Sequence, residues 1–260
     1  MLFGLTQSEI LAVLLIFTRV GALTVTAPLF SGRRVPLLLR AGLSLILALL
    51  FRPFVAVAEA GDIALPLLAM LLFKEALVGL TLGYVANMIF QVVQMAGEMQ
   101  DVQAGFGLAG VVDPNFGQSS AVLGQLIMAC TWLIFLLANG HHLLLHAMME
   151  SFAVVPLAGL EYQGALVPQM FHVVTALMGL ALKMSAPVIA AVLLADVALG
   201  MLQRTAPQLN IIAIGFQVKI AVAVVVLFLA LPLLLTLIRE LVPYMGNLMH
   251  EVLMQFRPVS

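Results

Sequence analysis

Four runs of the chain contain no Asp, Glu, Lys or Arg and are long enough to cross a bilayer: 76–97, 114–149, 162–182 and 220–238. An α-helix rises about 1.5 Å per residue, so roughly 18 to 20 apolar residues span the hydrocarbon core of a membrane. Hydrophobic residues make up 63% of the 260 and charged residues only 9%, whereas an ordinary soluble domain carries about 25% charged residues. The runs therefore predict an all-α protein of membrane type.

Single charges cut the remaining apolar pieces short: Arg19 interrupts 10–32, Arg40 and Arg52 bracket 41–51, and Lys183 and Asp196 bracket 184–195. A charge at the centre of a bilayer costs roughly 2.5 to 3.5 kcal/mol, so such residues should lie against protein or water. We predict burial within protein for Arg19 and Lys183. For Arg52 and Arg239, which lie near the ends of runs, we expect side chains that reach the headgroups.

Proline and glycine mark the expected helix ends. They occur at Pro28, Ser31-Gly32, Arg52-Pro53, Gly61-Asp62, Asp113-Pro114, Asn139-Gly140, Pro156, Pro168, Pro207 and Pro243. At Asn139-Gly140 we expect a helix C-terminus with Gly140 in the left-handed conformation. The sequence contains no visible linker or separate soluble domain.

The charge balance, the cysteine count and a missing phosphate-binding motif exclude several classes of function. There are 11 Lys and Arg against 12 Asp and Glu, so no basic face is available for nucleic acid. Cys130 is the only cysteine, which excludes an internal disulfide and a cysteine metal cluster. The phosphate-binding pattern G-x-x-x-x-G-K-[ST] does not occur, and we expect no cofactor.

Five polar residues form a stripe along one predicted helix: Asn87, Gln91, Gln94, Glu98 and Asp101. Their spacings of 4, 3, 4 and 3 residues place them on one face of an otherwise apolar helix. This face either lines water or meets polar groups of a neighbouring helix, and both readings place the helix inside an assembly. Gly79 and Gly83 form a G-x-x-x-G pattern on an adjacent face, which permits close approach of a helix from another subunit or from the same chain.

The stripe leads into the segment 105–118, GFGLAGVVDPNFGQ. Its glycines oppose a helix, and the residue before a proline favours extended backbone. Its side chains are nevertheless too apolar for a solvated loop. Irregular backbone at membrane depth persists only inside protein or beside an aqueous cavity. The segment is therefore either an apolar constriction of a pore or a re-entrant loop that fills a gap in the core.

Three motifs resemble the FliR family, whose virulence counterpart is SctT. They are GEMQDVQAGFGLAGVVDP (97–114), NGH (139–141) and SAPVIAAVLLADVALGMLQRTAPQLNIIAIGFQVK (185–219). Their order and spacing agree with the family over most of the chain, and the third motif is the most specific. The family consists of integral components of the type III secretion export gate, so the resemblance implies a non-enzymatic subunit of the flagellar gate in the bacterial cytoplasmic membrane at the flagellar basal body.

The resemblance also implies partners and roles. The chain is expected to be a single copy in an assembly with several FliP-like and FliQ-like subunits, near FlhB-like and FlhA-like components, with membrane lipid around it and exported unfolded proteins as cargo. Residues 1–180 resemble the FliP-like subunit, and residues 181–260 resemble the helical hairpin of the FliQ-like subunit. The implied pore plug comprises Gly105, Phe106, Gly107, Leu108, Gly110, Val111, Val112, Asp113, Pro114 and Phe116. The implied subunit contacts comprise Gly79, Gly83, Lys183, Asp196, Arg204, Gln208, Asn210 and Lys219.

Other readings remain open. His142, His146 and Glu150 fall at i, i+4 and i+8 beside His141, but no H-E-x-x-H pattern occurs, and histidines at a membrane interface explain the spacing better than a metal site. An ion-coupled secondary transporter is the more serious alternative because Arg19, Glu75, Asp101, Lys183 and Asp196 are charges of the kind that couple ions to solutes. A virulence export gate is a third reading.

Overall fold

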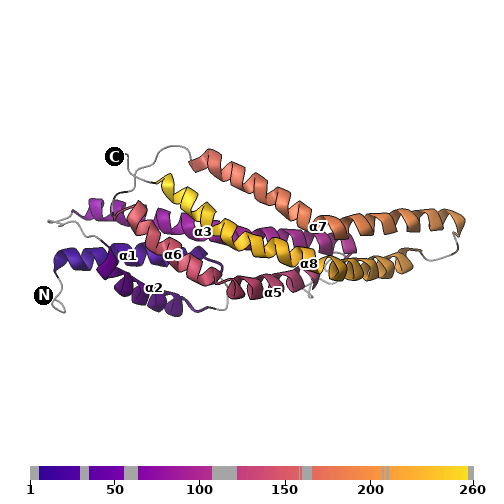
Figure 1. Cartoon of the computed structure of the whole chain (residues 1–260), viewed down its shortest axis with the longest axis horizontal. Helices are drawn as coiled ribbons and strands as arrows, with labels where there is room; N and C mark the ends of the chain where they lie inside the picture. Colours follow the sequence, from indigo (N-terminus) through magenta and orange to yellow (C-terminus); the bar gives the residue numbers. More distant parts are fainter. Residues whose placement is uncertain are drawn as a thin grey trace. The chain divides into compact units, whose positions relative to one another are not determined.

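The computed structural model of the chain describes residues 6–29, 35–55, 64–106, 122–157, 159, 166–206, 208 and 211–256. Within these ranges the secondary structure is helical and contains no strand (Figure 1), which confirms the all-α prediction. The helices are α1 (Gln7–Thr26), α2 (Leu37–Phe51), the short 3-10 helix η1 (Arg52–Phe54), α3 (Leu65–Ala104), α5 (Val122–Leu137), α6 (Gly140–Val154), α7 (Leu166–Thr205) and α8 (Ile211–Met254).

Five of the described helical stretches are long and apolar enough to cross a membrane, and the bent pair α5 and α6 makes a sixth if it counts as one span. The runs 76–97 and 220–238 lie within α3 and α8, and the described part of the run 162–182 lies within α7. The run 114–149 is not one helix, because its described part forms α5 and α6 with a bend of 62° between them. The left-handed residue at this bend is Asn139, with φ of 56°, and Gly140 instead begins α6. Asn tolerates this conformation better than most residues.

The chain divides into two compact units. Unit 1 comprises Met1–Met88, Asn139–Phe171 and Pro243–Ser260, and unit 2 comprises Ile89–Ala138 and His172–Val242. Helices α3, α7 and α8 therefore each contribute to both units. The boundary predicted after residue 180 is of another kind, because it separates a part that resembles the FliP-like subunit from a part that resembles the FliQ-like subunit. That division stays a prediction.

Helices α7 and α8 are longer than the charge-free runs. α7 continues through Lys183 and Pro187 and joins two pieces that the sequence suggested were separate. α8 continues through Pro243, so the predicted helix end there is wrong. A proline inside a helix costs about 3 kcal/mol. Leu241, Val242 and Met245 are buried beside Pro243, and burial of each such side chain contributes about 1.5 to 3 kcal/mol, which outweighs that cost.

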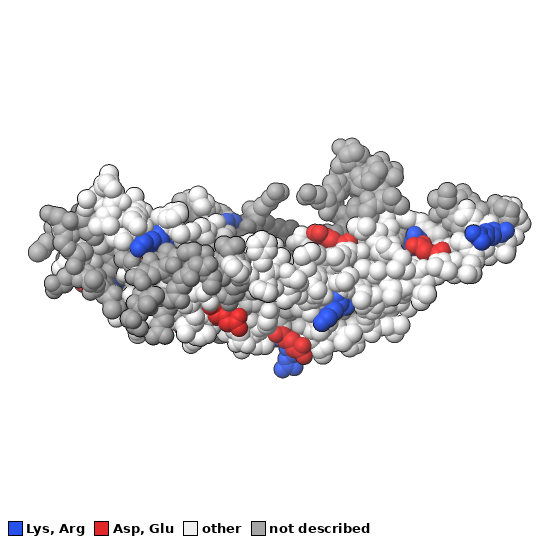
Figure 2. Space-filling model, turned by 90° about the horizontal axis from the view of Figure 1, so that it is seen from above, with Lys and Arg blue, Asp and Glu red and all other residues white. Residues whose placement is uncertain are grey.

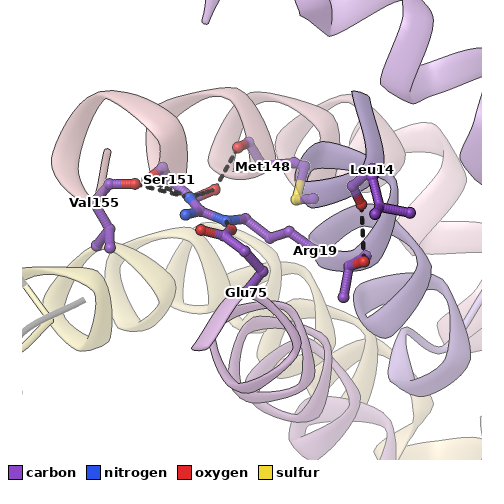
Figure 3. A network of polar contacts seen from close by, with 7 residues as sticks. Leu14, Arg19, Glu75, Met148, Ser151 and Val155 are labelled. Carbon is purple, nitrogen blue, oxygen red and sulfur yellow. Dashed lines mark hydrogen bonds and ion pairs between the residues drawn. The ribbon is translucent and has the colours of Figure 1, made fainter. Parts of the chain in front are cut away.

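A buried ion pair joins α1 to α3 in unit 1 (Figure 3). The Nε atom of Arg19 donates to Oε2 of Glu75 over 2.6 Å, and the two residues are 0% and 1% exposed. The predicted burial of Arg19 within protein is therefore confirmed. Because both charges are removed from solvent, loss of either one would leave the other buried without a counter-charge.

Arg19 also closes the C-terminal end of α6. Its Nη1 atom donates to the carbonyl of Ser151 over 2.9 Å and to the carbonyl of Val155 over 3.0 Å. The last carbonyls of a helix have no partner within the helix and carry partial negative charge, so a cation binds there favourably. The guanidinium carbon lies 4.4 Å from the ring centroid of Phe152, which adds a cation–π contact. One side chain thus connects three helices.

The glycines of α3 make this contact possible. Glu75, Gly79 and Gly83 are spaced four residues apart on the face of α3 that meets α1. A Cβ atom on Gly79 would collide with the carbonyl oxygen of Arg19, and one on Gly83 would collide with Thr26. Packing within the chain therefore accounts for both glycines. The face of α3 that carries them, which could have met another subunit, is occupied by α1.

Exposed charges are sparse. On the face drawn in Figure 2, charged residues stand singly or in pairs among uncharged ones. Arg52 is partly exposed and lies 3.6 Å from Glu9, and Arg239 is exposed. Lys183 is also exposed, and among the described residues no other helix covers that face of α7, so its burial against protein stays a prediction.

We expect Arg19→Ala to destabilise the chain strongly. The substitution leaves the Glu75 carboxylate without its buried cation and the α6 carbonyls without their donor, and breaking one side of a buried pair costs about 3 to 5 kcal/mol. The measurement is the midpoint of thermal unfolding of the tagged chain together with the chains that co-purify with it in mild detergent. Arg52→Ala is the control and should change the midpoint little, because its ion pair is partly exposed. Equal losses in the two variants would contradict the role of Arg19.

Gly79→Ala and Gly83→Ala should each lower the same midpoint. Overpacking typically costs about 1 to 3 kcal/mol, and here the obstacle includes backbone atoms of α1 that cannot rotate away. Gly42→Ala on α2 is the matched control because an added Cβ there meets nothing within 4 Å. Midpoints unchanged in the α3 variants would show that α1 and α3 are not in close contact.

Candidate functional site

The end of α3 is closed by backbone hydrogen bonds at the start of the predicted plug. The N–H of Gly105 donates to the carbonyl of Val102 over 3.2 Å, and the N–H of Phe106 donates to the carbonyl of Asp101 over 3.0 Å. Gly105 has φ of 97°. These bonds form a Schellman motif, in which a left-handed glycine ends a helix. The prediction that the segment does not continue the preceding helix is confirmed at this point.

The side chain of Asp101 begins the next helix. Its Oδ1 atom accepts from the N–H of Leu123 and its Oδ2 atom from the N–H of Gly124, both over 2.9 Å. The first N–H groups of a helix lack partners within the helix and attract negative charge, so a carboxylate stabilises them. Asp101 is 4% exposed. Its carbonyl therefore ends α3 while its carboxylate holds the start of α5.

Two glycines allow these helices to approach. A Cβ atom on Gly97 would collide with the backbone of Gly124, and one on Gly124 would lie 3.3 Å from the carbonyl carbon of Gly97. The backbones of α3 and α5 are therefore in contact one turn before Asp101. Without this contact the short side chain of Asp101 could not span the gap to α5.

Two further contacts fix the last turn of α3 within unit 2. The Nε2 atom of Gln100 donates to the carbonyl of Met184 on α7 over 3.1 Å, and Gln100 is 0% exposed. The ring of Phe216 on α8 lies against Gly105, where an added Cβ would be 2.9 Å from Cε2. Helices α5, α7 and α8 thus all contact the turn from which the predicted plug begins.

The five members of the polar stripe have different environments. Gln91, Gln94 and Glu98 are exposed, Asn87 is half-buried and Asp101 is buried. Gln94 donates to Glu98 over 2.8 Å along the helix. Whether the exposed members face water or another subunit stays a prediction, whereas Asp101 has partners inside the chain.

Most of the predicted plug lies outside the described residues. Gly105 and Phe106 are described, and they are the first residues beyond α3. The others fall in 107–121, which the structure does not describe: Gly107, Leu108, Gly110, Val111, Val112, Asp113, Pro114 and Phe116. The role of this segment as a plug therefore stays a prediction.

The predicted contact residues of the C-terminal hairpin fall into two groups. Asp196 on α7 and Lys219 on α8 form an ion pair of 2.5 Å, so they hold the two arms of the hairpin together. Lys183, Arg204 and Gln208 are exposed, and Asn210 lies outside the described residues. Contact of these residues with other subunits stays a prediction.

The histidines of α6 lie in unit 1. Glu150 bonds Nδ1 of His250 on α8 over 2.6 Å, and the rings of His141 and His142 lie against each other at a tilt of 37°, with centroids 4.2 Å apart. Among the described residues, no three His, Cys, Asp or Glu side chains are grouped as metal ligands.

Sequence reasoning missed the part that Asp101 plays. The spacing of the stripe grouped it with four residues of similar polarity, although its partners lie 22 and 23 residues further along the chain. The sequence does carry a signal for this role. An acid, Asp101, lies one turn before a helix end, and Gly97 and Gly124 lie on either side of the loop.

Comparison with known proteins places the chain among export proteins. Residues 10–245 match the family model described as bacterial export proteins, family 1. The flagellar biosynthetic protein FliR of Bacillus subtilis (strain 168) is 39% identical over 88% of this chain and 89% of its own length. FliR of Escherichia coli (strain K12) is 28% identical over 90% of each chain. The Yop proteins translocation protein T of Yersinia pestis is 28% identical over 86% of this chain and 87% of its own. The chain therefore belongs to the FliR/SctT family of bacterial export proteins.

Proposed function

We propose that this chain is a non-enzymatic subunit of the flagellar type III protein export gate, that it forms part of the protein-conducting channel, and that segment 105–118 is the plug of that channel. Membership of the family makes the chain a component of the flagellar export apparatus. The higher identity to a flagellar relative than to the virulence relative, 39% against 28%, favours the flagellum.

The observation that carries the proposal is the course of α3. Its stripe presents Gln91, Gln94 and Glu98 on the surface, and the helix ends at Ala104, directly before the apolar glycine-rich segment that begins at Gly105. Exposed amides and a carboxylate are unfavourable in lipid but suit the wall of an aqueous passage. Apolar side chains in a narrow passage exclude ions by dewetting. A polar wall that leads into an apolar segment is the arrangement that a closed channel requires.

The lengths of the helices support an assembly with unlike partners. Helices α3, α7 and α8 contain 40, 40 and 44 residues, which corresponds to about 60 to 66 Å against a hydrocarbon core of roughly 30 Å. Exposed apolar side chains such as Val102, Leu194 and Leu229 are spread along these helices. Lipid can cover only part of such a length. FliP-like and FliQ-like subunits would cover the rest, with FlhB-like and FlhA-like components nearby, in the cytoplasmic membrane.

The transporter alternative depends on charges that are free to bind ions. Arg19 pairs with Glu75, Asp101 accepts from the start of α5, and Asp196 pairs with Lys219. These contacts hold helices together, which supports a structural role for the charges. Lys183 is exposed on α7 and suits a contact with another subunit.

The composition of the purified complex tests the proposal. The tagged chain is extracted in mild detergent from cells that also make the partner subunits, and the native mass and the co-purifying chains are measured. We expect one copy of this chain with several copies of smaller unlike subunits, because its exposed apolar surface needs cover. Recovery of a stable monomer or a symmetric homodimer would favour a carrier and contradict the proposal.

Deletion of residues 106–112 tests the plug. We expect the complex to assemble with normal composition and to leak ions, because the apolar obstruction is removed while the contacts of Asp101 and Gly97 with α5 are retained. The measurement is ion permeability of membrane vesicles that contain the complex. An assembled deletion complex that is as tight as the unmodified one would show that the segment is not the plug.

A further inference from the structure

We propose that α2 is a helix through which this chain contacts the acyl chains of the bilayer, and that its outward face stays against lipid when the other subunits have assembled. Helix α2 lies beside α1 in unit 1 (Figure 1). The proposed function gives the exposed apolar surface to lipid and to unlike subunits together. The inference rests on that function and names a helix that takes lipid.

Most of the circumference of α2 is exposed within the chain. Only Ser44 and Ala48 of its 15 residues are buried. The exposed large side chains of α2 and η1 are aliphatic apart from one aromatic ring, and each is at least 46% exposed: Leu37, Leu38, Leu39, Leu45, Ile46, Leu49, Leu50 and Phe54. A contiguous apolar surface of this kind is unfavourable in water, so lipid or another protein must cover it.

The polar side chains of α2 lie on the face that meets the rest of the chain. Arg40 and Ser44 are the only two polar residues of the helix. Ser44 is buried, and its hydroxyl oxygen lies 2.9 Å from that of Thr24 on α1. Arg40 precedes Ser44 by one turn and is half-buried, so both residues share one face. A helix at a water surface has the reverse arrangement, with its polar residues outward. The outward face of α2 therefore does not lie in water.

The size of the outward side chains favours lipid over a subunit. Helices that associate inside a membrane meet through small or polar residues, because lipid tails are as apolar as leucine and association gains little from apolar burial. The chain follows this rule where its own helices meet closely, as at Gly79 and Gly97. The outward face of α2 instead carries large branched side chains, among them Leu45, Ile46 and Leu49.

Other helices have exposed faces of a different kind. Helix α3 exposes Gln94 and Glu98, and α7 exposes Lys183. A charge at the centre of a bilayer costs roughly 2.5 to 3.5 kcal/mol, so these faces require water or polar groups of a subunit. Helix α2 exposes no such group on its outward face. The surface of α2 therefore suits lipid, whereas those of α3 and α7 do not suit lipid alone.

The dimensions of α2 also match a bilayer. Residues 37–54, which are α2 and η1 together, form one of the candidate spans. They rise about 28 Å, close to a hydrocarbon core of roughly 30 Å. Arg52 lies near the end of this stretch and is partly exposed, so its cation can reach the anionic phosphates of the headgroups.

A photoreactive residue at position 46 tests the inference in membranes. The tagged chain with Ile46→p-benzoylphenylalanine is made in cells that also make the partner subunits, and ultraviolet light couples the side chain to neighbouring C–H bonds. We expect phospholipid adducts of the chain by mass spectrometry and no adduct with another protein. Leu194→p-benzoylphenylalanine on α7 is the comparison and should give protein adducts. A protein adduct at position 46, or the absence of a lipid adduct there, would overturn the inference.

A steric test uses Gly42 on the outward face of α2. Gly42 lies one turn before Ile46, and an added Cβ there meets nothing within 4 Å. Lipid tails rearrange around a larger side chain, whereas a packed helix does not. We expect Gly42→Leu to leave the yield and composition of the purified complex unchanged. Gly79→Leu, whose added atoms collide with α1, is the matched control and should lower the yield several-fold. Loss of unlike subunits from the Gly42→Leu complex would show that a subunit packs on α2 and would contradict the inference.

Failure of this inference is distinguishable from failure of the proposed function. If the unmodified chain purifies without unlike subunits, the proposed function is wrong, and lipid adducts at position 46 still support the place of α2. If unlike subunits co-purify and position 46 couples to one of them, the proposed function stands and α2 is a subunit contact.

Discussion

Buried polar groups need hydrogen-bond partners, and this apolar chain offers few. The fold depends on two buried charges that find such partners at helix ends. Arg19 supplies a cation to the C-terminal carbonyls of α6, and Asp101 supplies an anion to the N-terminal N–H groups of α5. Each sign matches the partial charge at that helix end. The bent pair of α5 and α6 therefore begins at a buried carboxylate and ends at a buried guanidinium, one in each unit.

These contacts depend on glycine as much as on charge. Gly79 lets the backbone of α1 approach α3 beside the Arg19–Glu75 pair, and Gly97 with Gly124 does the same for α3 and α5 beside Asp101. A larger side chain at any of these positions would move the helices apart by more than a hydrogen bond tolerates. Small residues and buried charges act together in both units, although they lie far apart in the sequence.

The arrangement suits a protein that works among other subunits. The buried charges of Arg19, Glu75 and Asp101 hold helices of the same chain together. Long apolar surfaces and exposed polar groups such as Lys183 and Glu98 remain for external contacts. The proposed place in a closed channel requires a wall compatible with water and an apolar obstruction.

Several features followed from the sequence because they depend on local chemistry. Charge-free runs predicted the long helices α3, α7 and α8, and Gly105 predicted the end of α3. The burial of Arg19 also followed, since a guanidinium so deep in an apolar run needs a protein partner. Single prolines were a poorer guide, because packing on both sides of Pro243 outweighs the missing backbone hydrogen bond.

By itself, then, the sequence determined the helical class, the membrane character, the polar face and the place where the glycine-rich segment begins, because composition and period act over a few turns of one helix. Only the tertiary structure decided which partner each polar residue takes: Glu75 and α6 for Arg19, the start of α5 for Asp101, and Lys219 for Asp196. It also decided that Gly79 and Gly83 pack on α1. These contacts join residues far apart in the chain, and a periodic pattern carries no information about which distant helix will cover a given face.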